Sequence, residues 1–454
     1  MPPLVLINAV GLTPRLLPHA PHLHALAGKG WMRPLREVLP AVTCTAQASM
    51  LTGVLPEQHG IVGNGWLYRD TMEVRFWQQS NHLIQAEPLY VTAKKRNPSF
   101  RCAKLFWWFN QGADVAISVT PKPHYGIDGN KVFGIHGTPE GLTEQLERDL
   151  GPFPFATFWG PMAELPCTNW IAKCAAKVLR EHHPDLTLIY LPHLDYDPQR
   201  YGPEGSDMPR LVRELDESCR IILDAAQADG ANVWVVSEYG HVQVKRPVYL
   251  NRVQREAGLL QVRRGPFGEQ LDGFASRAFA VCDHQLAHVY VADADDLEKT
   301  RTVLSAVPGV AKVLAGDERG AFGLLHRRSG ELIVLSERDA WFAYPFWLDD
   351  NLAPDYARTV AIRNKPGYDP CELFFDPNRP FVKGRAAFRL LQKKLGFRMK
   401  MDVIPLDASI VRGSHGLAAR DPQDRPLLIG TGPAPGEQLA MTDVHDLVLQ
   451  ALSQ

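Results

Sequence analysis

Short apolar runs alternate with helical patterns along the first half of the chain. The apolar runs have the length and β-branched content of buried strands, and the segments between them repeat with the period of an amphipathic helix. We expect strands at 4–10, 35–39, Leu186–Leu191 and Asn232–Val236, and helices at 20–27, 46–51 and 211–228. This alternation predicts an α/β fold whose mostly parallel central sheet is sandwiched by helices.

The pattern changes after Leu250. Strands at 287–292 and 310–314 flank a helix at 295–307, and Leu324, Leu332 and Ile333 suggest further short strands. We predict an inserted α+β cap domain at 251–394 and a core formed by 1–250 and 395–454. The segment 106–139 is rich in aromatic residues, glycine and proline, and we expect it to be a lid or a substrate-binding loop.

Polar clusters follow the two most apolar strands. Leu186–Leu191 runs into Asp195, and Asn232–Val236 runs into Glu238. In open α/β sheets, ligands bind at the carboxyl ends of the strands, so these clusters predict a site at one sheet edge.

A hydroxyl residue, Thr43, precedes a helical pattern and the run TG-x-x-P-x-x-HG. A helix N-terminus carries unsatisfied N–H groups and the positive end of the helix dipole, so it favours an anion. A nucleophile at this position can attack phosphorus, and since no base adjoins Thr43 in sequence, we expect a metal ion to activate it. The alternative is that Thr43 is only a helix N-cap.

The charge balance argues against two classes of partner. With 49 basic and 50 acidic residues, the net charge is −1, which does not favour a nucleic-acid polymer, and no polybasic run favours a membrane surface. The seven cysteines are scattered and form no C-x-x-C pair, as is typical of reduced thiols. The first residues already read as a strand and no apolar run spans a bilayer, so we expect a cytoplasmic protein.

Four motifs resemble the alkaline phosphatase superfamily, and most of all its nucleotide pyrophosphatase/phosphodiesterase branch, which includes phosphonoacetate hydrolase. They are Thr43 with Thr52, Gly53, Pro56, His59 and Gly60; Asp195 with Tyr201, Gly202 and Pro203; Ser237 to Gly240; and Gly413 to Gly416. Their order along the chain matches that of the family.

The resemblance implies two metal ions, usually zinc, and a covalent phospho-threonine intermediate. It implies that Thr43 is the nucleophile and a metal ligand, and that Asp195 and His415 hold one metal. The other histidine of that metal site is here Gln199, which we expect to take its place.

The second metal site of the family is altered in this sequence. Its aspartate and histidine correspond to Glu238 and Tyr239. A further aspartate corresponds to Val10, with Asn8 two residues earlier on the same strand face. Oxygen atoms dominate the candidate ligand set, so we expect weaker zinc binding than is usual in the family, with manganese or magnesium as alternatives. The oxygen-bearing candidates are Asn8, Thr43, Asp195, Gln199, Glu238 and Tyr239.

Other polar and aromatic residues are candidates around this centre. We expect Gln47, Asn64 and Trp107 to contact the substrate, and His241 either to replace the histidine lost at Tyr239 or to be an ordinary loop residue. In the cap, Asp283, His284 and His288 resemble a metal cluster. We favour the alternative that His284 and His288 share a strand face and form local hydrogen bonds, while Asp283 and His284 stay candidates for missing metal ligands.

The sequence therefore predicts a metal-dependent phosphodiesterase or nucleotide pyrophosphatase that acts on a small phosphorylated substrate through Thr43. Two alternatives remain open at this stage. The altered ligands also fit a binding protein that has lost hydrolysis, or a phosphotransferase of the same superfamily.

Overall fold

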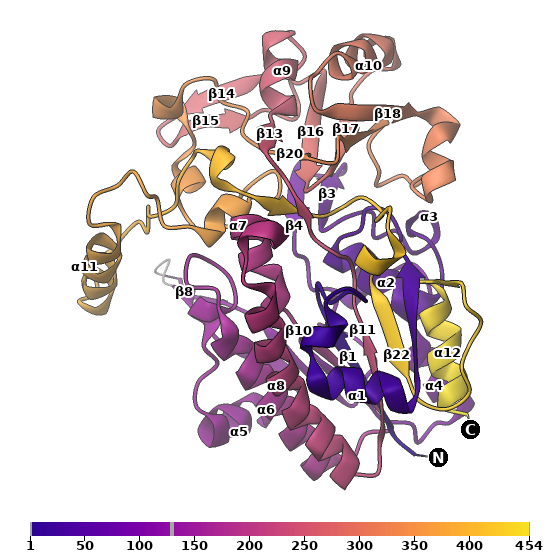
Figure 1. Ribbon diagram of the computed structural model, residues 1–454. Helices are drawn as coiled ribbons and strands as arrows, with labels where there is room; N and C mark the ends of the chain where they lie inside the picture. The colour runs from indigo at the N-terminus through magenta and orange to yellow at the C-terminus, as the bar shows by residue number, and fades with distance from the viewer. Residues whose placement is uncertain (1, 128–130, 454) are drawn as a thin grey trace.

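The computed structural model describes residues 2–127 and 131–453, and its centre is a nine-stranded sheet (Figure 1). β1 (Leu4–Ala9) lies between β10 (Leu186–Leu191) and β11 (Asn232–Val236), and both neighbours run parallel to it. The order is β23-β2-β22-β11-β1-β10-β5-β6-β9, with β2 (Trp31–Arg36), β5 (Cys102–Leu105), β6 (Ile117–Pro121), β9 (Ile135–Thr138), β22 (Leu427–Gly430) and β23 (Leu439–Ala440). Among these strands only β22 and β9 oppose the rest, so the predicted mostly parallel α/β sheet is confirmed.

Helices cover both faces of this sheet (Figure 1). Apolar side chains of α1 (Pro21–Lys29), α6 (Leu165–His182) and α8 (Met208–Ala228) pack on one face. Those of α2 (Thr43–Thr52), α4 (Leu89–Arg96) and α12 (Asp443–Ala451) pack on the other. The two apolar layers bury β1 completely, which explains why its sequence is apolar at nearly every position.

A second sheet forms its own layer, with the order β16-β17-β19-β18 and antiparallel neighbours throughout. Its strands are β16 (Ala278–Asp283), β17 (Leu286–Val291), β18 (Val310–Ala315) and β19 (Leu332–Ser336), and α9 (Leu250–Glu256) and α10 (Leu297–Ser305) accompany them. The predicted strand-helix-strand unit is present, but β19 lies between its two strands. Leu324 lies outside any strand, which corrects that expectation. The sheet has a hydrophobic core of its own, while the exact cap boundaries stay a prediction.

The segment 106–139 is not a free loop, which corrects the expectation of a lid. It contains β6 and β9, which form one edge of the central sheet by antiparallel pairing. Backbone hydrogen bonds therefore tie this segment into the sheet.

The remaining strands and α-helices are short, apart from α5, α7 and α11. They are α3 (Pro56–His59), β3 (Gly65–Tyr68), β4 (Glu73–Phe76), β7 (His124–Tyr125), β8 (Lys131–Val132), α5 (Leu142–Leu150), α7 (Asp197–Gly205), β12 (Val242–Gln243), β13 (Arg246–Val248), β14 (Val262–Gly265), β15 (Gly268–Leu271), β20 (Ala340–Phe342), α11 (Val382–Lys394) and β21 (Gly413–Ser414). The helix α11 projects away from the body of the molecule (Figure 1). The seven cysteines are buried and unpaired. No helix in the described residues is both long and apolar enough to cross a bilayer.

Candidate active site

Three adjacent strands end at the same edge of the central sheet. Asn8, near the end of β1, is in register with Tyr190 of β10 and Val236 of β11. The chain leaves β10 towards Asp195 and leaves β11 towards Glu238. The parallel register thus gathers side chains that lie far apart in sequence, at the edge where the strand pattern predicted a site.

Thr43 is the first residue of α2, and its hydroxyl is not used as a helix cap. The N-cap is Val42, which has extended backbone angles and offers no capping side chain. The Thr43 Oγ1 atom lies 3.0 Å from the hydroxyl of Tyr239, which donates to Asp195 Oδ1 at 3.2 Å. Because the tyrosine has one proton, the Thr43 hydroxyl is the donor to Tyr239. The N-cap alternative for Thr43 therefore does not describe its side chain.

Glu238 is fully buried and is held by two amides. Asn8 Nδ2 donates to Glu238 Oε1 at 2.6 Å, and Gln47 Nε2 donates to the same oxygen at 2.7 Å. Glu238 Oε2 has no hydrogen-bond partner among the described residues. Burial raises the pKa of Glu238 to about 8, although the amides of Gln47 and Asn8 lower it. This carboxyl group is therefore mostly protonated at neutral pH.

Asp195, His241 and His415 form a cluster in which one potential ligand atom from each residue lies within 4.8 Å of the others. His241 Nε2 lies 3.1 Å from Asp195 Oδ1, and His415 Nε2 lies 3.9 Å from the same oxygen. His415 Nδ1 is 2.7 Å from the carbonyl oxygen of Ala41, so Nδ1 carries the proton and Nε2 keeps its lone pair. That Nε2 is buried and unpaired among the described residues, as expected of a ligand atom that faces a cation.

A short strand pairing brings the two histidines together. Val242 of β12 is in register with Ser414 of β21, and His241 and His415 flank this pair. Gly413 is needed for the approach, because a Cβ atom there would lie 1.8 Å from the carbonyl oxygen of Pro198. The glycine in the GSHG motif thus lets the last motif reach the site.

Gln199 makes other contacts than those the resemblance implies. Its Nε2 donates to the backbone carbonyl of Asp195 at 2.8 Å, and its Oε1 accepts from the hydroxyl of Tyr368 at 2.6 Å. Both ends of the amide are thus used within the protein. The position that the family gives to a histidine is occupied here by a residue that supports the backbone next to Asp195.

Residues of the second sheet and of the loops beyond it complete the site. Four aromatic rings lie one on another, with distances of 3.6, 3.7 and 3.8 Å between the centroids of neighbouring rings. Their order in space is Tyr239, His415, His284 and Tyr368. Burial lowers the pKa of His284 well below its usual range, so this imidazole is neutral. The stack holds the ring of His415 from both sides, and His284 thus lies against a candidate ligand.

Asp283 and His288 hold the second sheet to the core by hydrogen bonds. Asp283 accepts from the backbone and side-chain N–H groups of Asn64, at 2.7 and 3.1 Å, and burial raises its pKa to about 7. His288 Nε2 donates to the carbonyl of Val62 at 2.8 Å, and burial lowers the pKa of His288 to about 4. His288 is therefore held by hydrogen bonds to residues distant in sequence, since its Nδ1 also accepts from the backbone N–H of Gly330.

The three residues expected to contact a substrate lie in different settings. Gln47 accepts a hydrogen bond from the backbone N–H of Trp108 and donates one to Glu238. Asn64 accepts a hydrogen bond from the backbone N–H of Cys44, in the first turn of α2. For these two amides, substrate contact stays a prediction. Trp107 is fully buried in the core beneath the sheet, so the expectation that it contacts a substrate is wrong.

The sequence alone does not assign two residues, His241 and Tyr368, to the site. The sequence leaves both a ligand role and an ordinary loop position open for His241. The feature that favours a ligand role is its position three residues after Glu238. Tyr368 was missed, because no pattern near it indicates a contact with Gln199. The site is almost closed to solvent, since Thr43 is 2% exposed and Asp195 9% exposed.

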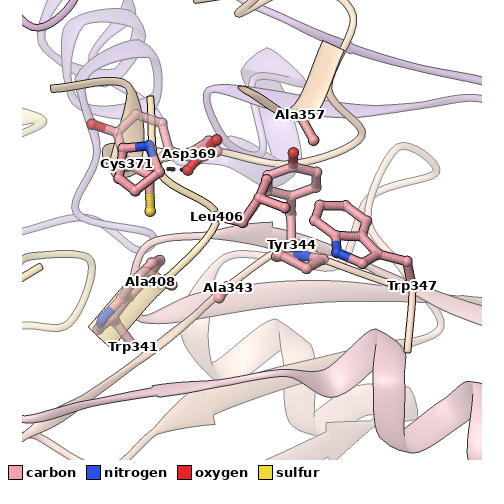
Figure 2. A pocket seen from close by; sticks show the side chains of 12 residues that line it. Trp341, Ala343, Tyr344, Trp347, Ala357, Asp369, Cys371, Leu406 and Ala408 are labelled. Carbon is pink, nitrogen blue, oxygen red and sulfur yellow. Dashed lines mark hydrogen bonds between the residues drawn. The ribbon is translucent and has the colours of Figure 1, made fainter. Parts of the chain in front are cut away.

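A separate hollow lies in the second layer, between β20 and the segment around Asp369 (Figure 2). Trp341, Tyr344 and Trp347 line it, and Asp369 accepts from the backbone N–H of Cys371. It contains neither Thr43 nor the Asp195 cluster, but Tyr368, which stacks on His284, also lines it.

Comparisons with known proteins identify the family of the chain. Residues 4–369 match the family model of type I phosphodiesterase / nucleotide pyrophosphatase. Ectonucleotide pyrophosphatase/phosphodiesterase family member 1 from Homo sapiens is 24% identical over 244 residues, which cover 51% of this chain and 22% of that protein. The protein of the same name from Rattus norvegicus is also 24% identical over 244 residues, which cover 51% of this chain and 23% of that protein. The chain thus spans less than a quarter of the length of these relatives.

Solved structures share the fold. Phosphonoacetate hydrolase from Sinorhizobium meliloti 1021, in complex with phosphonoformate, has a TM-score of 0.62 and 16% identity, and the match covers 99% of this chain and 95% of that chain. Murine ectonucleotide pyrophosphatase / phosphodiesterase 5 has a TM-score of 0.59 and 15% identity, with 100% and 95% covered. With the family model matched over most of its length, the chain belongs to the type I phosphodiesterase / nucleotide pyrophosphatase family.

Proposed function

We propose that the chain is a metal-dependent hydrolase of small phosphoric diesters or pyrophosphates, with Thr43 as the nucleophile. The observation that carries the proposal is the position of the Thr43 hydroxyl, at the N-terminus of α2 and one hydroxyl away from the Asp195 cluster. A phosphoryl group placed there meets both an attacking oxygen and the positive end of a helix.

In this proposal Asp195, His241 and His415 hold one divalent cation. Two imidazole nitrogens and one carboxylate oxygen suit zinc, and also manganese. The cation, when bound, supplies positive charge that polarises a phosphoryl oxygen. Gln199 is not part of this ligand set, because both ends of its amide are already paired.

The chain's own groups orient the attack and remove the proton. Thr43 Oγ1 forms the bond to phosphorus, its proton moves to the Tyr239 hydroxyl, and the tyrosine proton moves towards Asp195. The leaving alcohol or phosphate takes the electron pair of the broken P–O bond, which gives a phospho-threonine that water then hydrolyses. Glu238, protonated at neutral pH, adds no negative charge beside the phosphoryl group, and its unpaired Oε2 can donate to it.

The substrate class rests on shared chemistry. Solved structures of this fold have been obtained in complex with phosphonoformate and with AMP, and both ligands present one tetrahedral phosphorus to the protein. The same phosphoryl or phosphonyl group is the part of a substrate that the N-terminus of α2 would bind here.

Turnover of chromogenic esters tests the proposal. The p-nitrophenyl esters of phosphate, phenylphosphonate and thymidine monophosphate are each incubated with zinc, manganese or magnesium. We expect turnover by the wild type, and at least a loss of about 10³-fold in Thr43→Ala. Thr43→Ser is the matched control, because it keeps the hydroxyl and should retain part of the activity.

A mass-spectrometric search for phosphorylated Thr43 in rapidly quenched samples separates nucleophilic attack from simple binding. Absence of turnover with every metal, together with ligand binding that Thr43→Ala leaves unchanged, would overturn the proposal in favour of a binding protein.

A further inference from the structure

The helix α11 presents its apolar face to solvent and its charged face to the protein. Phe388, Leu391 and Leu395 are 56%, 51% and 65% exposed, and their spacing places them on one side of the helix. Arg389 and Lys393, on the opposite side, are only half-buried against the protein. A surface helix normally turns its apolar side to the protein and its charged side to solvent. Here the apolar row is exposed, and no described residue covers it.

Polar contacts fix the rotation of the helix. Arg385 forms a salt bridge to Asp402 at 2.6 Å, and Arg389 lies 3.8 Å from the same carboxylate. Lys393 lies over the ring of Phe133, 5.8 Å from its centroid. All three residues lie on one face, so their contacts turn the row of Phe388, Leu391 and Leu395 outward.

The segment around this helix is strongly basic. Residues 377–401 include eight Lys or Arg and no Asp or Glu, although the whole chain has a net charge of −1. Lys383 and Lys394 are exposed and flank the apolar row, and the exposed Phe397 and Arg398 extend it past the end of the helix. The segment also projects from the body of the molecule (Figure 1), so no other element shields it.

We propose that α11 docks on an anionic lipid surface. Phe388, Leu391 and Leu395 would enter the boundary between headgroups and acyl chains, while Lys383, Lys394 and Arg398 contact lipid phosphates. Charge complementarity selects this partner, because a second copy of α11 would bring its own five Lys and Arg side chains close to those of the first. Nucleic acid would use the cations but would leave the apolar row exposed to water.

This inference does not depend on the proposed function. The expectation that the chain avoids membrane surfaces rested on the lack of a run of consecutive basic residues, whereas the eight basic residues here are spread over 377–401. Peripheral docking needs only the local excess of positive charge and a helix of inverted orientation.

Vesicle flotation tests the docking. The full chain is mixed with vesicles of phosphatidylcholine alone, or of phosphatidylcholine with about 30% phosphatidylglycerol, at low and high salt. We expect binding only to the anionic vesicles, weakened by salt. The double variant Phe388→Glu, Leu391→Glu should bind at least about tenfold less, because it loses both apolar insertion and net positive charge.

The matched control is Phe267→Glu with Phe274→Glu, since both are exposed phenylalanines outside α11. This control should lose little binding, and all variants should melt as the wild type does because the changed side chains are exposed. Thr43→Ala should bind as the wild type does, whatever its activity.

Three results would overturn the proposal. They are no binding to anionic vesicles, equal loss in the control variant, or a wild-type dimer in solution that the α11 variant dissociates without lipid. The last result would assign the exposed row to self-association.

Discussion

The two halves of the candidate active site differ in how they handle charge. Around Asp195, two imidazoles face a carboxylate, and a buried nitrogen of His415 has no hydrogen-bond partner among the described residues, as expected of a cation site. Around Thr43, the carboxyl group of Glu238 is already held by Asn8 and Gln47. One half therefore has the features of a metal centre, and in the other, two amides donate to a single oxygen of the Glu238 carboxyl group.

This difference between the two halves favours one cation per chain over the two that the family resemblance implies. Tyr239 stands where the family resemblance places a histidine, and its hydroxyl bridges Thr43 and Asp195. A hydroxyl can pass a proton but is a poor ligand when protonated, and burial raises the pKa of Tyr239 well above its usual range. We therefore expect one tightly bound cation per chain, and four substitutions test the contrast between the halves.

The largest effect is expected for His241→Ala. It removes a nitrogen ligand from the cluster, so cation affinity and turnover should fall by about 10³-fold or more. Metal content after gel filtration and activity against added metal measure the two effects. Gln199→Ala is the control, and its cation affinity should stay within about tenfold of wild type. If Gln199→Ala loses the metal and His241→Ala keeps it, the ligand assignment is reversed.

Tyr239→Phe should have the next largest effect. It deletes the hydroxyl that accepts the proton of Thr43, so turnover should drop about 10²-fold, while the content of bound metal stays unchanged. Parallel measurement of the turnover number and the metal stoichiometry separates these outcomes. Loss of metal in this variant would instead make Tyr239 a ligand, as the resemblance implies.

A smaller effect is expected for His284→Ala. It removes the ring that stacks on His415 from the side opposite Tyr239, so His415 should be less well oriented and metal affinity should fall about tenfold. His284→Phe preserves an aromatic ring at this position, and competition with a chromogenic chelator should give an affinity close to that of wild type. Equal losses in both variants would contradict a role through stacking.

Glu238→Gln should have the smallest effect on activity, within about threefold, if the group is uncharged and holds no cation. A loss of about 10²-fold or more, with a drop in metal content, would show that Glu238 holds a second cation. The amide keeps the oxygen that accepts from Asn8 and Gln47.

The pH dependence of stability sharpens the test of Glu238. The pKa is about 8 in the folded protein and near 4.5 when unfolded, so the folded state binds the extra proton. The contribution of Glu238 to the free energy of unfolding is fully present below pH 4.5 and is lost as the pH rises through 8. From pH 6 to pH 8 the wild type should lose about 2 kcal/mol relative to Glu238→Gln. Urea unfolding of both proteins at these pH values measures the difference, and parallel curves would mean that Glu238 is already ionised at pH 6.

Local pattern was enough for much of the fold and part of the site. The strands Leu186–Leu191 and Asn232–Val236 have the bounds that their apolar runs predict, and Thr43 begins a helix. The spacing of apolar residues indicates whether a segment is buried on one face or two, and glycine, proline and capping residues mark its ends. Both are local properties of the chain. The same logic led to Asp195 and Glu238, since each follows a buried strand.

Tertiary structure alone decided which of these groups act together. The pairing of β12 with β21 joins His241 to His415 across more than 170 positions, and no local pattern encodes that register. The apparent loop 106–139 became a sheet edge for the same reason, and Trp107 became core. The outward rotation of α11 likewise follows from Asp402 and Phe133, which lie outside the helix. Side-chain chemistry is written in the sequence, but its partners are set by long-range packing, whose contacts depend on the whole chain.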